Sequence, residues 1–562
     1  MSDKVKIFAL GGLDEYGKNL YCVDINDDIF VFECGIKFPD KSTPGVNFII
    51  ADYTYLAENK NRVKGIFISH GHEDMMGGLG FLFTKAGLKA PVYGTDVTIA
   101  FCKRDLQRLE LKPEIEFHIV KPDIEYEIAG HKFMFFQTAH SIMGSVGIAI
   151  ETDMGYIVYT GNFIVEYNGD NLNNRLDIVA LSKFSARGVA LLMCESIGAE
   201  IPGFTAPSHK LVPLIAKQFG DAPGRVFFAL YDYDIYRLGE ILKLCITNKK
   251  KIIFLGEQTN SILQTLNSVG QFAVPKENIA SLDDIFRIRE QDLVFIIMGH
   301  RKSLFTQITS IAGGDYEDKK VMIKPTDTFI IAAPAVEGIE TVTIDTVDDV
   351  YRTGCNVIYI NDHKISSMHA HEDDLRTLLS ILHPKFYLPV AGEFRHLLAN
   401  AKIATNSSLG YNHMNTIILD NGMILELSEN KIRVLEDTIH VGDLLVDGIG
   451  VGDVGALVLA ERQKLADDGV VCMSCGVSSV EKKAIAGPDI QMRGFVLVKD
   501  SESLIDNLAE IITSTCNEIL ARDGTIDEIK EEAHEKAVKY LRKVTGRDPM
   551  VLPIIIDIDS KD

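Results

Sequence analysis

The sequence predicts an α/β protein built from several domains, and three observations support this. The 562-residue chain is long enough for two to four domains with substantial cores. Residues 1–206 alternate short β-rich runs with turns, whereas residues 207–349 alternate helical patterns with apolar strands. The second pattern is typical of a parallel sheet in an inserted α/β domain.

The composition and charge exclude some classes of protein. Hydrophobic residues make up 46% of the chain and charged residues 24%, which is ordinary for a soluble protein. The net charge of -22 argues against a non-specific polybasic nucleic-acid binder, although it leaves room for a local basic groove. The polar N-terminus predicts no signal peptide, no apolar run reaches the roughly 18 residues of a membrane span, and the nine cysteines are scattered. We therefore expect a cytoplasmic protein with no membrane contact.

The first region, residues 1–206, is predicted to be rich in strands. Turn residues at Gly11–Gly12 and Asn26–Asp28 separate the first three β-rich runs, which are Lys4–Leu10, Leu20–Ile25 and Ile29–Phe32. Later strands end at residues that carry chemistry, namely Ser69, His140, Thr160 and Glu195. Functional side chains at strand ends are usual in sheet proteins with functional loops.

The middle of the chain is predicted to hold an insert and then a return to the first domain. The strands expected in the insert are Arg225–Leu230, Lys251–Leu255, Leu293–Met298 and Thr328–Ala333. Strand Val357–Ile360, helix Asp373–Leu382 and strand Phe386–Val390 follow in residues 350–436. The helix has leucines on one stripe, so one face is expected to be buried.

The tail is predicted to be a separate small α+β domain. Residues 437–453 include the Gly-rich run Val446–Asp453 and are expected to form a linker. Residues 454–562 contain β-rich runs, two helical patterns and a last strand. These are Ala456–Leu459, Val470–Cys475 and Phe495–Val498, then Leu504–Leu520 and about 526–543, then Met550–Ile556.

One short stretch predicts a metal site. After the apolar run Ile66–Ile68, the residues His70, His72 and Asp74 occupy alternate positions, and Gly77–Gly78 leads into a helical pattern. Imidazole and carboxylate groups that leave a strand end together are suitable ligands for a divalent cation such as zinc or manganese.

Short motifs that occur in one order along the whole chain point to a family. They are Gly11-Gly12 with Gly17-Lys-Asn19, Ser69-His-Gly-His-Glu-Asp74, His140-Ser-Ile142, Thr160-Gly-Asn-Phe163, Pro202-Gly-Phe-Thr205, Met368-His-Ala370, Val390-Ala-Gly-Glu393 and Gly487-Pro-Asp-Ile490. With these motifs the chain resembles the ribonuclease J family, of the metallo-β-lactamase superfamily with a β-CASP insert. The resemblance implies an αββα sandwich from residues 1–206 and 350–436, a β-CASP domain at 207–349 and a C-terminal domain at 454–562 for assembly.

The resemblance also implies a two-metal site, which this chain retains only in part. In the family, two divalent metals activate a water for attack on an RNA phosphodiester. The ligands of the first metal match His70, His72 and His140, and Asp74 matches one ligand of the second. The remaining positions have changed: the bridging Asp falls at Asn162, and two ligand His fall at Met75 and Ala391. A neutral amide, a thioether and a methyl group are poor replacements, so the second site keeps one ligand of four.

Two interpretations of the remaining histidines stay open. Three imidazoles can hold one zinc or manganese ion with an open coordination position. Alternatively, they pack and hydrogen-bond without a metal. By resemblance, Glu195 and His369 match a general-acid pair of the family, or they form a structural salt link. Glu33 matches an early acid that orients the metal ligands.

The expected RNA contacts are altered as well. The family's polar phosphate-binding segments fall at Ala332–Pro334 and at Ser367–Ala370, where Met368 replaces a glycine. Ser367 and His369 are kept there as candidate RNA contacts. A third segment reads Gly299-His-Arg-Lys302, so Arg301 and Lys302 either give a new phosphate contact or are solvated.

These observations predict a degenerate ribonuclease J paralogue in the cytoplasm. We expect a weak or inactive nuclease that supports an active ribonuclease J paralogue in a heteromer, and that also forms a homodimer or tetramer. The first alternative is a weak one-metal ribonuclease with 5′→3′ exonuclease or endonuclease action, which would lose cutting when His70 is replaced. The second alternative is a metallohydrolase of small molecules, which the β-CASP-like insert disfavours.

Overall fold

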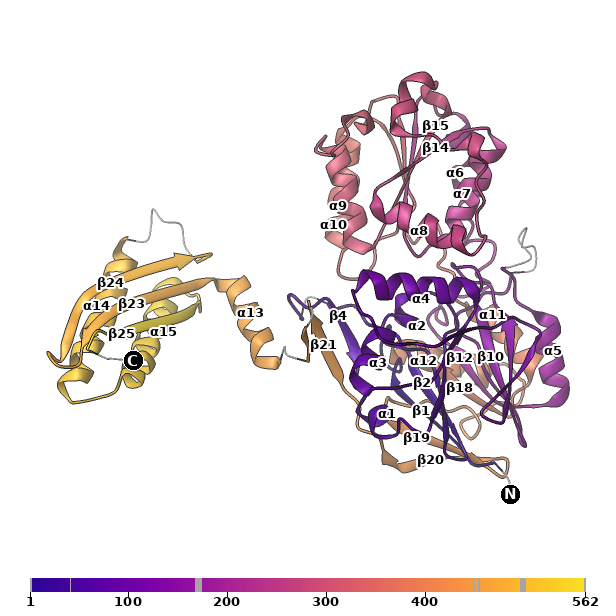
Figure 1. The fold of residues 1–562 in the computed structure, drawn as a ribbon, viewed down its shortest axis with the longest axis horizontal. Coiled ribbons are helices and arrows are strands. Elements are labelled where there is room, and N and C mark those ends of the chain that lie inside the picture. Colours follow the sequence, from indigo (N-terminus) through magenta and orange to yellow (C-terminus); the bar gives the residue numbers. More distant parts are fainter. Residues whose placement is uncertain are drawn as a thin grey trace. The chain divides into compact units, whose positions relative to one another are not determined.

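The computed structural model describes residues 3–40, 42–166, 174–448, 450–452, 455–495 and 502–559. The chain divides into two compact units, shown in Figure 1. Unit 1 contains residues 1–38 and 48–444, and unit 2 contains residues 39–47 and 445–562.

Unit 1 contains a sandwich of two sheets. The first sheet has the strand order β20-β19-β1-β2-β3-β5-β6-β7. Its strands are β1 (Val5–Gly11), β2 (Leu20–Ile25), β3 (Asp28–Phe32), β5 (Val63–Phe67), β6 (Val92–Gly94), β7 (Phe117–Ile119), β19 (Met423–Ser428) and β20 (Lys431–Thr438). The second sheet has the order β18-β12-β11-β10-β9-β8. Its strands are β8 (Glu125–Ile128), β9 (His131–Gln137), β10 (Val146–Thr152), β11 (Gly155–Tyr159), β12 (Val189–Glu195) and β18 (Phe386–Val390).

Apolar side chains from both sheets form the core between them. Phe67 of β5 stacks on Phe133 of β9 with ring centroids 4.6 Å apart, which joins the two layers directly. Helices α1 (Thr54–Glu58), α3 (Leu79–Ala86), α4 (Asp96–Arg108), α5 (Ile178–Arg187), α11 (Glu372–Leu382) and α12 (Phe394–Asn406) accompany the sheets. The predicted stripe of α11 is buried against the second sheet, through Leu375, Leu378, Leu379 and Leu382. These layers give the predicted αββα sandwich.

The insert of unit 1 has a parallel sheet in the order β14-β15-β13-β16-β17. The strands are β13 (Val226–Tyr231), β14 (Lys251–Leu255), β15 (Leu293–Gly299), β16 (Thr328–Ile331) and β17 (Asn356–Tyr359). Helices α6 (Val212–Gly220), α7 (Ile235–Thr247), α8 (Glu257–Ser268), α9 (Arg301–Ala312) and α10 (Glu340–Arg352) lie around this sheet (Figure 1). Because β17 belongs to the sheet, the insert extends past the boundary expected at residue 349.

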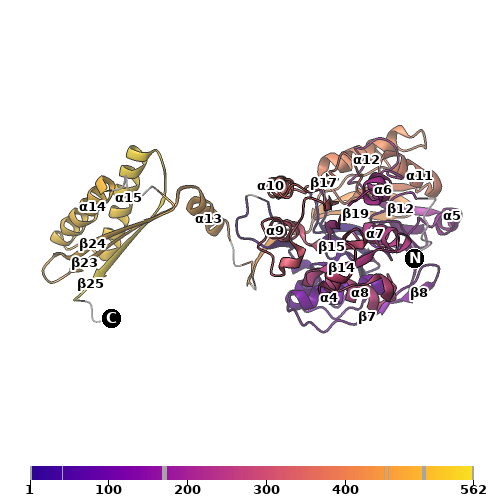
Figure 2. The same ribbon diagram turned by 90° about the horizontal axis from the view of Figure 1, so that it is seen from above.

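Unit 2 has a three-stranded sheet in the order β24-β23-β25. Its strands are β23 (Val470–Ser478), β24 (Lys483–Arg493) and β25 (Met550–Asp557). Helices α14 (Glu502–Ala521) and α15 (Ile526–Thr545) cover one face of this sheet, as Figure 2 shows. Two short strands, β21 (Asp443–Asp447) and β22 (Gly450–Val451), fall inside the expected linker at 437–453.

One predicted strand of the tail was wrong. The run Ala456–Leu459 begins α13 (Ala456–Asp468), because the apolar residues continue into the strong helix formers Ala460 to Leu465. The run predicted at Phe495–Val498 lies largely outside the described residues. Within the described parts of the chain, no helix has the length and apolar character that a membrane span requires.

A buried ion pair stabilises the insert, and its removal gives a first prediction. The Arg225 guanidinium donates to both carboxylate oxygens of Asp327, at 3.0 and 2.5 Å, and both side chains are almost fully buried. Asp327→Ala would leave a buried, uncompensated cation, so we expect a loss of about 3–5 kcal/mol in the free energy of unfolding. Urea unfolding followed by circular dichroism measures this loss.

The matched control removes a carboxylate on the surface of the same insert. Asp349 pairs with Arg352 one helical turn later, and the Arg352 side chain is 74% exposed. Asp349→Ala should change the free energy of unfolding by less than about 1 kcal/mol. Equal effects of the two substitutions would contradict the structural role given to Asp327.

Candidate functional site

The residues of the metal signature lie at one edge of the sandwich, where several strands end. His70 and His72 follow β5 and directly precede the short helix α2 (Glu73–Met76). His140 follows β9, Asn162 follows β11, and Glu195 is the last residue of β12. The sequence places these residues up to 125 positions apart, and the ends of their strands bring them together.

Three histidines form a compact cluster. The ring centroids are 4.7 Å apart for His70 and His72, 4.7 Å for His70 and His140, and 4.9 Å for His72 and His140. One nitrogen of each ring lies within 4.8 Å of the other two. His70 and His140 are buried, whereas His72 is half-buried.

Hydrogen bonds fix the orientation of the three rings. His140 donates through Nδ1 to the Met368 carbonyl at 2.6 Å, and His72 donates through Nε2 to the Tyr233 carbonyl at 3.1 Å. Because a carbonyl only accepts, the opposite nitrogens of these two rings carry lone pairs, and they lie 3.3 Å apart. His70 uses Nδ1 for a 2.8 Å hydrogen bond with the Ser69 hydroxyl, and its Nε2 has no hydrogen-bond partner.

This donor set fits a divalent cation. Two facing lone pairs and a buried nitrogen without a partner are unfavourable by themselves, and a cation bound between them would satisfy all three atoms. Burial lowers the pKa of His72 to about 4 and holds the pKa values of His70 and His140 well below the ordinary value. The rings are therefore neutral at pH 7, which is the protonation state that binds a metal.

Asn162, which by resemblance falls where the family has a bridging carboxylate, is buried. The side chain is 1% exposed, and neither its oxygen nor its nitrogen has a hydrogen-bond partner. A buried amide without partners costs free energy of about 1–3 kcal/mol. The amide is therefore free to bond to a ligand or water at the cluster, but it carries no charge to share between two cations.

The positions that the resemblance predicts for a second metal offer one ligand. Met75 is fully buried and Ala391 is 3% exposed, and neither has a donor suited to zinc or manganese. Asp74 is kept, and burial raises its pKa to about 6. The Asn19 side chain donates to the Asp74 backbone carbonyl at 3.0 Å, which holds the start of α2 in place.

Glu195 and His369 form a close pair beside the histidine cluster. His369 Nδ1 lies 2.7 Å from Glu195 Oε2, and its ring centroid lies 5.3 Å from that of His140. Glu195 Oε1 also accepts hydrogen bonds from the backbone amides of Phe163 and Ala370. Burial opposes protonation of His369, but the Glu195 carboxylate outweighs it, and the pKa of His369 is raised. The pair can therefore hold a proton next to the cluster.

The residues considered for RNA contact differ in their surroundings. The Arg301 guanidinium lies over the Phe38 ring at 4.6 Å and donates to the Glu337 carbonyl at 2.5 Å. Lys302 and Ser367 are exposed. Arg301 thus joins the start of α9 in the insert to the loop after β3 in the sandwich, while Lys302 remains open to solvent.

A neighbouring charge network was not predicted from the sequence. His300 lies 3.3 Å from Glu73 and 3.4 Å from Asp232, while Arg108 pairs with Glu73 and Arg104 with Asp232. These groups connect the sandwich to the insert next to the cluster. One feature of the sequence could have indicated this network: Glu73 lies inside the metal signature, and Asp232 directly follows β13.

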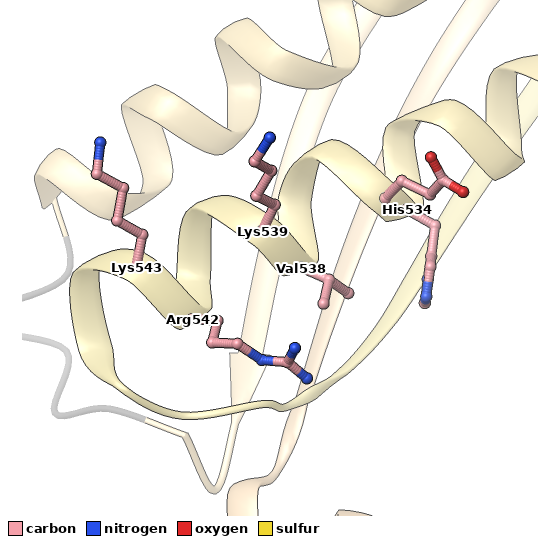
Figure 3. A pocket seen from close by; sticks show the side chains of 6 residues that line it. His534, Val538, Lys539, Arg542 and Lys543 are labelled. Carbon is pink, nitrogen blue, oxygen red and sulfur yellow. The ribbon is translucent and has the colours of Figure 1, made fainter.

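A separate pocket on α15 of unit 2 offers no comparable site. It is lined by six residues of that helix, namely His534, Glu535, Val538, Lys539, Arg542 and Lys543. Figure 3 shows Lys539 and Lys543 pointing to one side of the helix and Arg542 to the other, so the cations do not converge. Arg542 pairs with Asp548 at 2.9 Å. Cations near a helix C-terminus stabilise the helix, which accounts for this group.

Comparisons with known proteins identify relatives over the whole chain. Three family models match: "Metallo-beta-lactamase superfamily" at residues 15–257, "Ribonuclease J, beta-CASP domain" at 223–350 and "Ribonuclease J C-terminal domain" at 457–558. Ribonuclease J2 of Bacillus subtilis is 31% identical over 558 residues, which are 99% of both chains. Ribonuclease J 2 of Staphylococcus epidermidis is 30% identical over 99% of this chain and 98% of its own.

A solved structure supports the fold. The crystal structure of a protein of unknown function from Enterococcus faecalis V583 aligns with a TM-score of 0.53 and 13% identity. The alignment covers 75% of this chain and 100% of that one.

The buried acid Glu33 gives a prediction about pH. Burial raises its pKa to about 8, although the Ser69 amide donates to it at 3.1 Å. A raised pKa contributes stability below the unfolded value of about 4.5, and that stability is lost as the pH rises toward 8. The three buried histidines add stability as the pH rises through their unfolded pKa of about 6.5, but they do so equally in a Glu33→Gln variant, so the difference between the two proteins isolates Glu33.

We therefore expect the metal-free protein to lose stability relative to Glu33→Gln between about pH 5 and 8, with little further relative change at higher pH. The measurement is the melting temperature of both proteins in a chelator across that range. Parallel pH profiles for the two proteins would show that Glu33 is already ionised at neutral pH.

Proposed function

Because this chain belongs to the ribonuclease J family, we propose that it is an RNA-processing subunit with a degenerate metal site, which supports an active paralogue. RNA processing follows from the family. The degenerate state of the site is supported by one observation above all. Three inward-facing imidazoles are present, but Asn162 stands where a bridging carboxylate is required.

The loss of the bridge matters because of charge. Two divalent ions about 3.5–4 Å apart repel each other, and a carboxylate between them supplies a negative charge that offsets this repulsion. Asn162 supplies none, and Met75 and Ala391 remove two further ligands. We infer that the site binds at most one ion, held by His70, His72 and His140.

A single ion would supply one part of the hydrolytic chemistry. When bound, it lowers the pKa of a coordinated water toward 7. The protein's own residues supply the rest. His369 is held at Nδ1 by Glu195, so its Nε2 is the nitrogen that can deliver a proton to a leaving oxygen. With one ion, the leaving oxygen has no second cation to stabilise it, and we expect weak cutting or none.

Unit 2 carries a surface that supports assembly. Strand β25 lies at one edge of its sheet, and the side chains that point away from α14 and α15 are aliphatic. Leu552, Ile554 and Ile556 are 43%, 47% and 60% exposed. Among the described strands none pairs with the outer edge of β25, and an exposed apolar face next to such an edge is typical of an interaction surface. We propose that this face contributes to a homodimer or tetramer and to a heteromer with an active ribonuclease J paralogue.

Cleavage of a 5′-monophosphorylated RNA with manganese or zinc tests the proposal. We expect little or no cutting by the purified chain, and the same rate for a His70→Ala/His72→Ala control. Cutting that the control abolishes would show that one ion suffices, and it would replace the supporting role with the weak one-metal ribonuclease.

A gain-of-function variant tests the same interpretation from the other side. Met75→His, Asn162→Asp and Ala391→His together restore the ligands of a second metal. Ala391 has φ 56°, a region in which histidine is enriched among non-glycine residues, so the backbone can accept the change. We expect at least a roughly hundredfold rise in cutting rate, since paired metals stabilise both attacking and leaving oxygens.

The control for this variant adds His70→Ala to the three restoring substitutions. It should return the rate to that of the original chain. If the restored protein binds two metals but still fails to cut RNA, the defect lies in access of RNA to the site and not in the missing ligands.

A further inference from the structure

A buried carboxylate outside the metal signature connects three segments of the site. Asp374 is the third residue of α11 and is fully buried. It accepts hydrogen bonds from Val165 and Thr205, which belong to two other loops, and from His371, the N-cap residue that ends the loop before α11. The metal signature contains none of these four residues.

The contacts of Asp374 are made mainly with backbone amides. Oδ1 accepts from the Val165 amide at 2.9 Å, and Oδ2 accepts from the Thr205 amide at 2.9 Å and the His371 amide at 3.0 Å. The Thr205 hydroxyl lies 2.8 Å from Oδ2 and 2.6 Å from the His369 carbonyl. With one proton, this hydroxyl donates to one of the two oxygens at a time.

Two of the three loops carry a residue of the site, and the third follows a strand that ends in one. The Val165 loop contains Asn162, and it also contains Phe163, whose amide donates to Glu195. The Thr205 loop follows Glu195 along the chain. The His371 loop contains His369.

The His371 loop also orients the metal cluster. The Met368 carbonyl in this loop accepts the hydrogen bond that fixes the ring of His140. A shift of the loop would therefore turn a metal ligand as well as the proton-holding His369.

No cation explains the burial of this charge. Among the described residues, Asp374 forms no ion pair with a lysine, arginine or histidine side chain. Its charge is stabilised instead by three amides and by the N-terminus of α11. Oδ1 accepts from the Val165 amide alone, so movement of that loop leaves a buried acceptor unsatisfied. Movement of the Thr205 loop removes the Thr205 amide and hydroxyl from Oδ2 and leaves it only the His371 amide.

We propose that Asp374 is a positioning residue of the site, which holds the loops of Asn162 and His369 and the loop after Glu195 in one arrangement. It acts through these loops and touches neither the histidine cluster nor a reacting atom. The inference rests on the proposed one-ion site only for the measurement of metal affinity. The positions of the loops can be tested without metal.

The main test compares Asp374→Asn with Asp373→Asn. Both remove one negative charge from the first turn of α11, but Asp373 is 36% exposed and pairs with Arg376. In metal-free protein, we expect hydrogen–deuterium exchange of residues 160–166, 197–205 and 366–371 to rise together by roughly tenfold in Asp374→Asn alone. Equal exchange in the two variants would overturn the proposal.

The second readout is the binding of cobalt, followed by its visible absorption spectrum. We expect Asp374→Asn to raise the Kd for cobalt by roughly 10–100-fold and to change the spectrum, as loss of a group that orients metal ligands does. If the unsubstituted chain binds no cobalt, the one-ion site is wrong, and the exchange pattern still decides the role of Asp374.

Two further variants separate positioning from general stability. Leu378→Val weakens the packing of α11 against the core and leaves the hydrogen bonds to the three loops in place. It should change the exchange rates and the Kd for cobalt by less than about twofold. Thr205→Val replaces the hydroxyl with a methyl group and keeps the Thr205 amide, so it tests the proposal if Asp374→Asn does not fold. It should speed exchange in residues 366–371 and weaken cobalt binding, and the absence of both effects would count against the proposal.

Discussion

Three neutral imidazoles face one another at the edge of the sandwich, and contacts from distant parts of unit 1 hold them in this arrangement. Each ring is fixed through the nitrogen that points away from the cluster. For His140 the acceptor comes from the segment after the insert, and for His72 it is the Tyr233 carbonyl of the insert itself. The insert therefore helps to orient the histidine cluster, because it sets which nitrogen of His72 carries the proton.

The strands and helices could be predicted from the sequence largely because their patterns are local. The alternation of buried runs and turns located β2, β14 and β18 with the bounds that the structure has. Ala456–Leu459 failed because a four-residue apolar run does not separate a strand from the first turn of a helix. The metal signature was found because two of its histidines and its aspartate lie within five residues.

The parts of the site that sequence reasoning missed depend on contacts between distant segments. His72 and Tyr233 are 161 positions apart, and His140 and Met368 are 228 apart. No local pattern marks a backbone carbonyl as an acceptor for an imidazole. The charge network of His300, Glu73 and Asp232 was missed for the same reason, since each residue alone looks like an ordinary surface charge.

The pairing of strands in both sheets of the sandwich has a consequence for the order in which the chain folds during synthesis. Val5 of β1 lies opposite Leu427 of β19, and β12 pairs with β18, so both pairings join strands on opposite sides of the insert. The five strands of the insert are complete by residue 359, before β18 and β19 have been made. Domains fold as units as they leave the ribosome, and the insert is the first complete sheet of unit 1 that closes without later residues. The last strands of unit 1 to be synthesised therefore complete the two sheets that were begun before the insert.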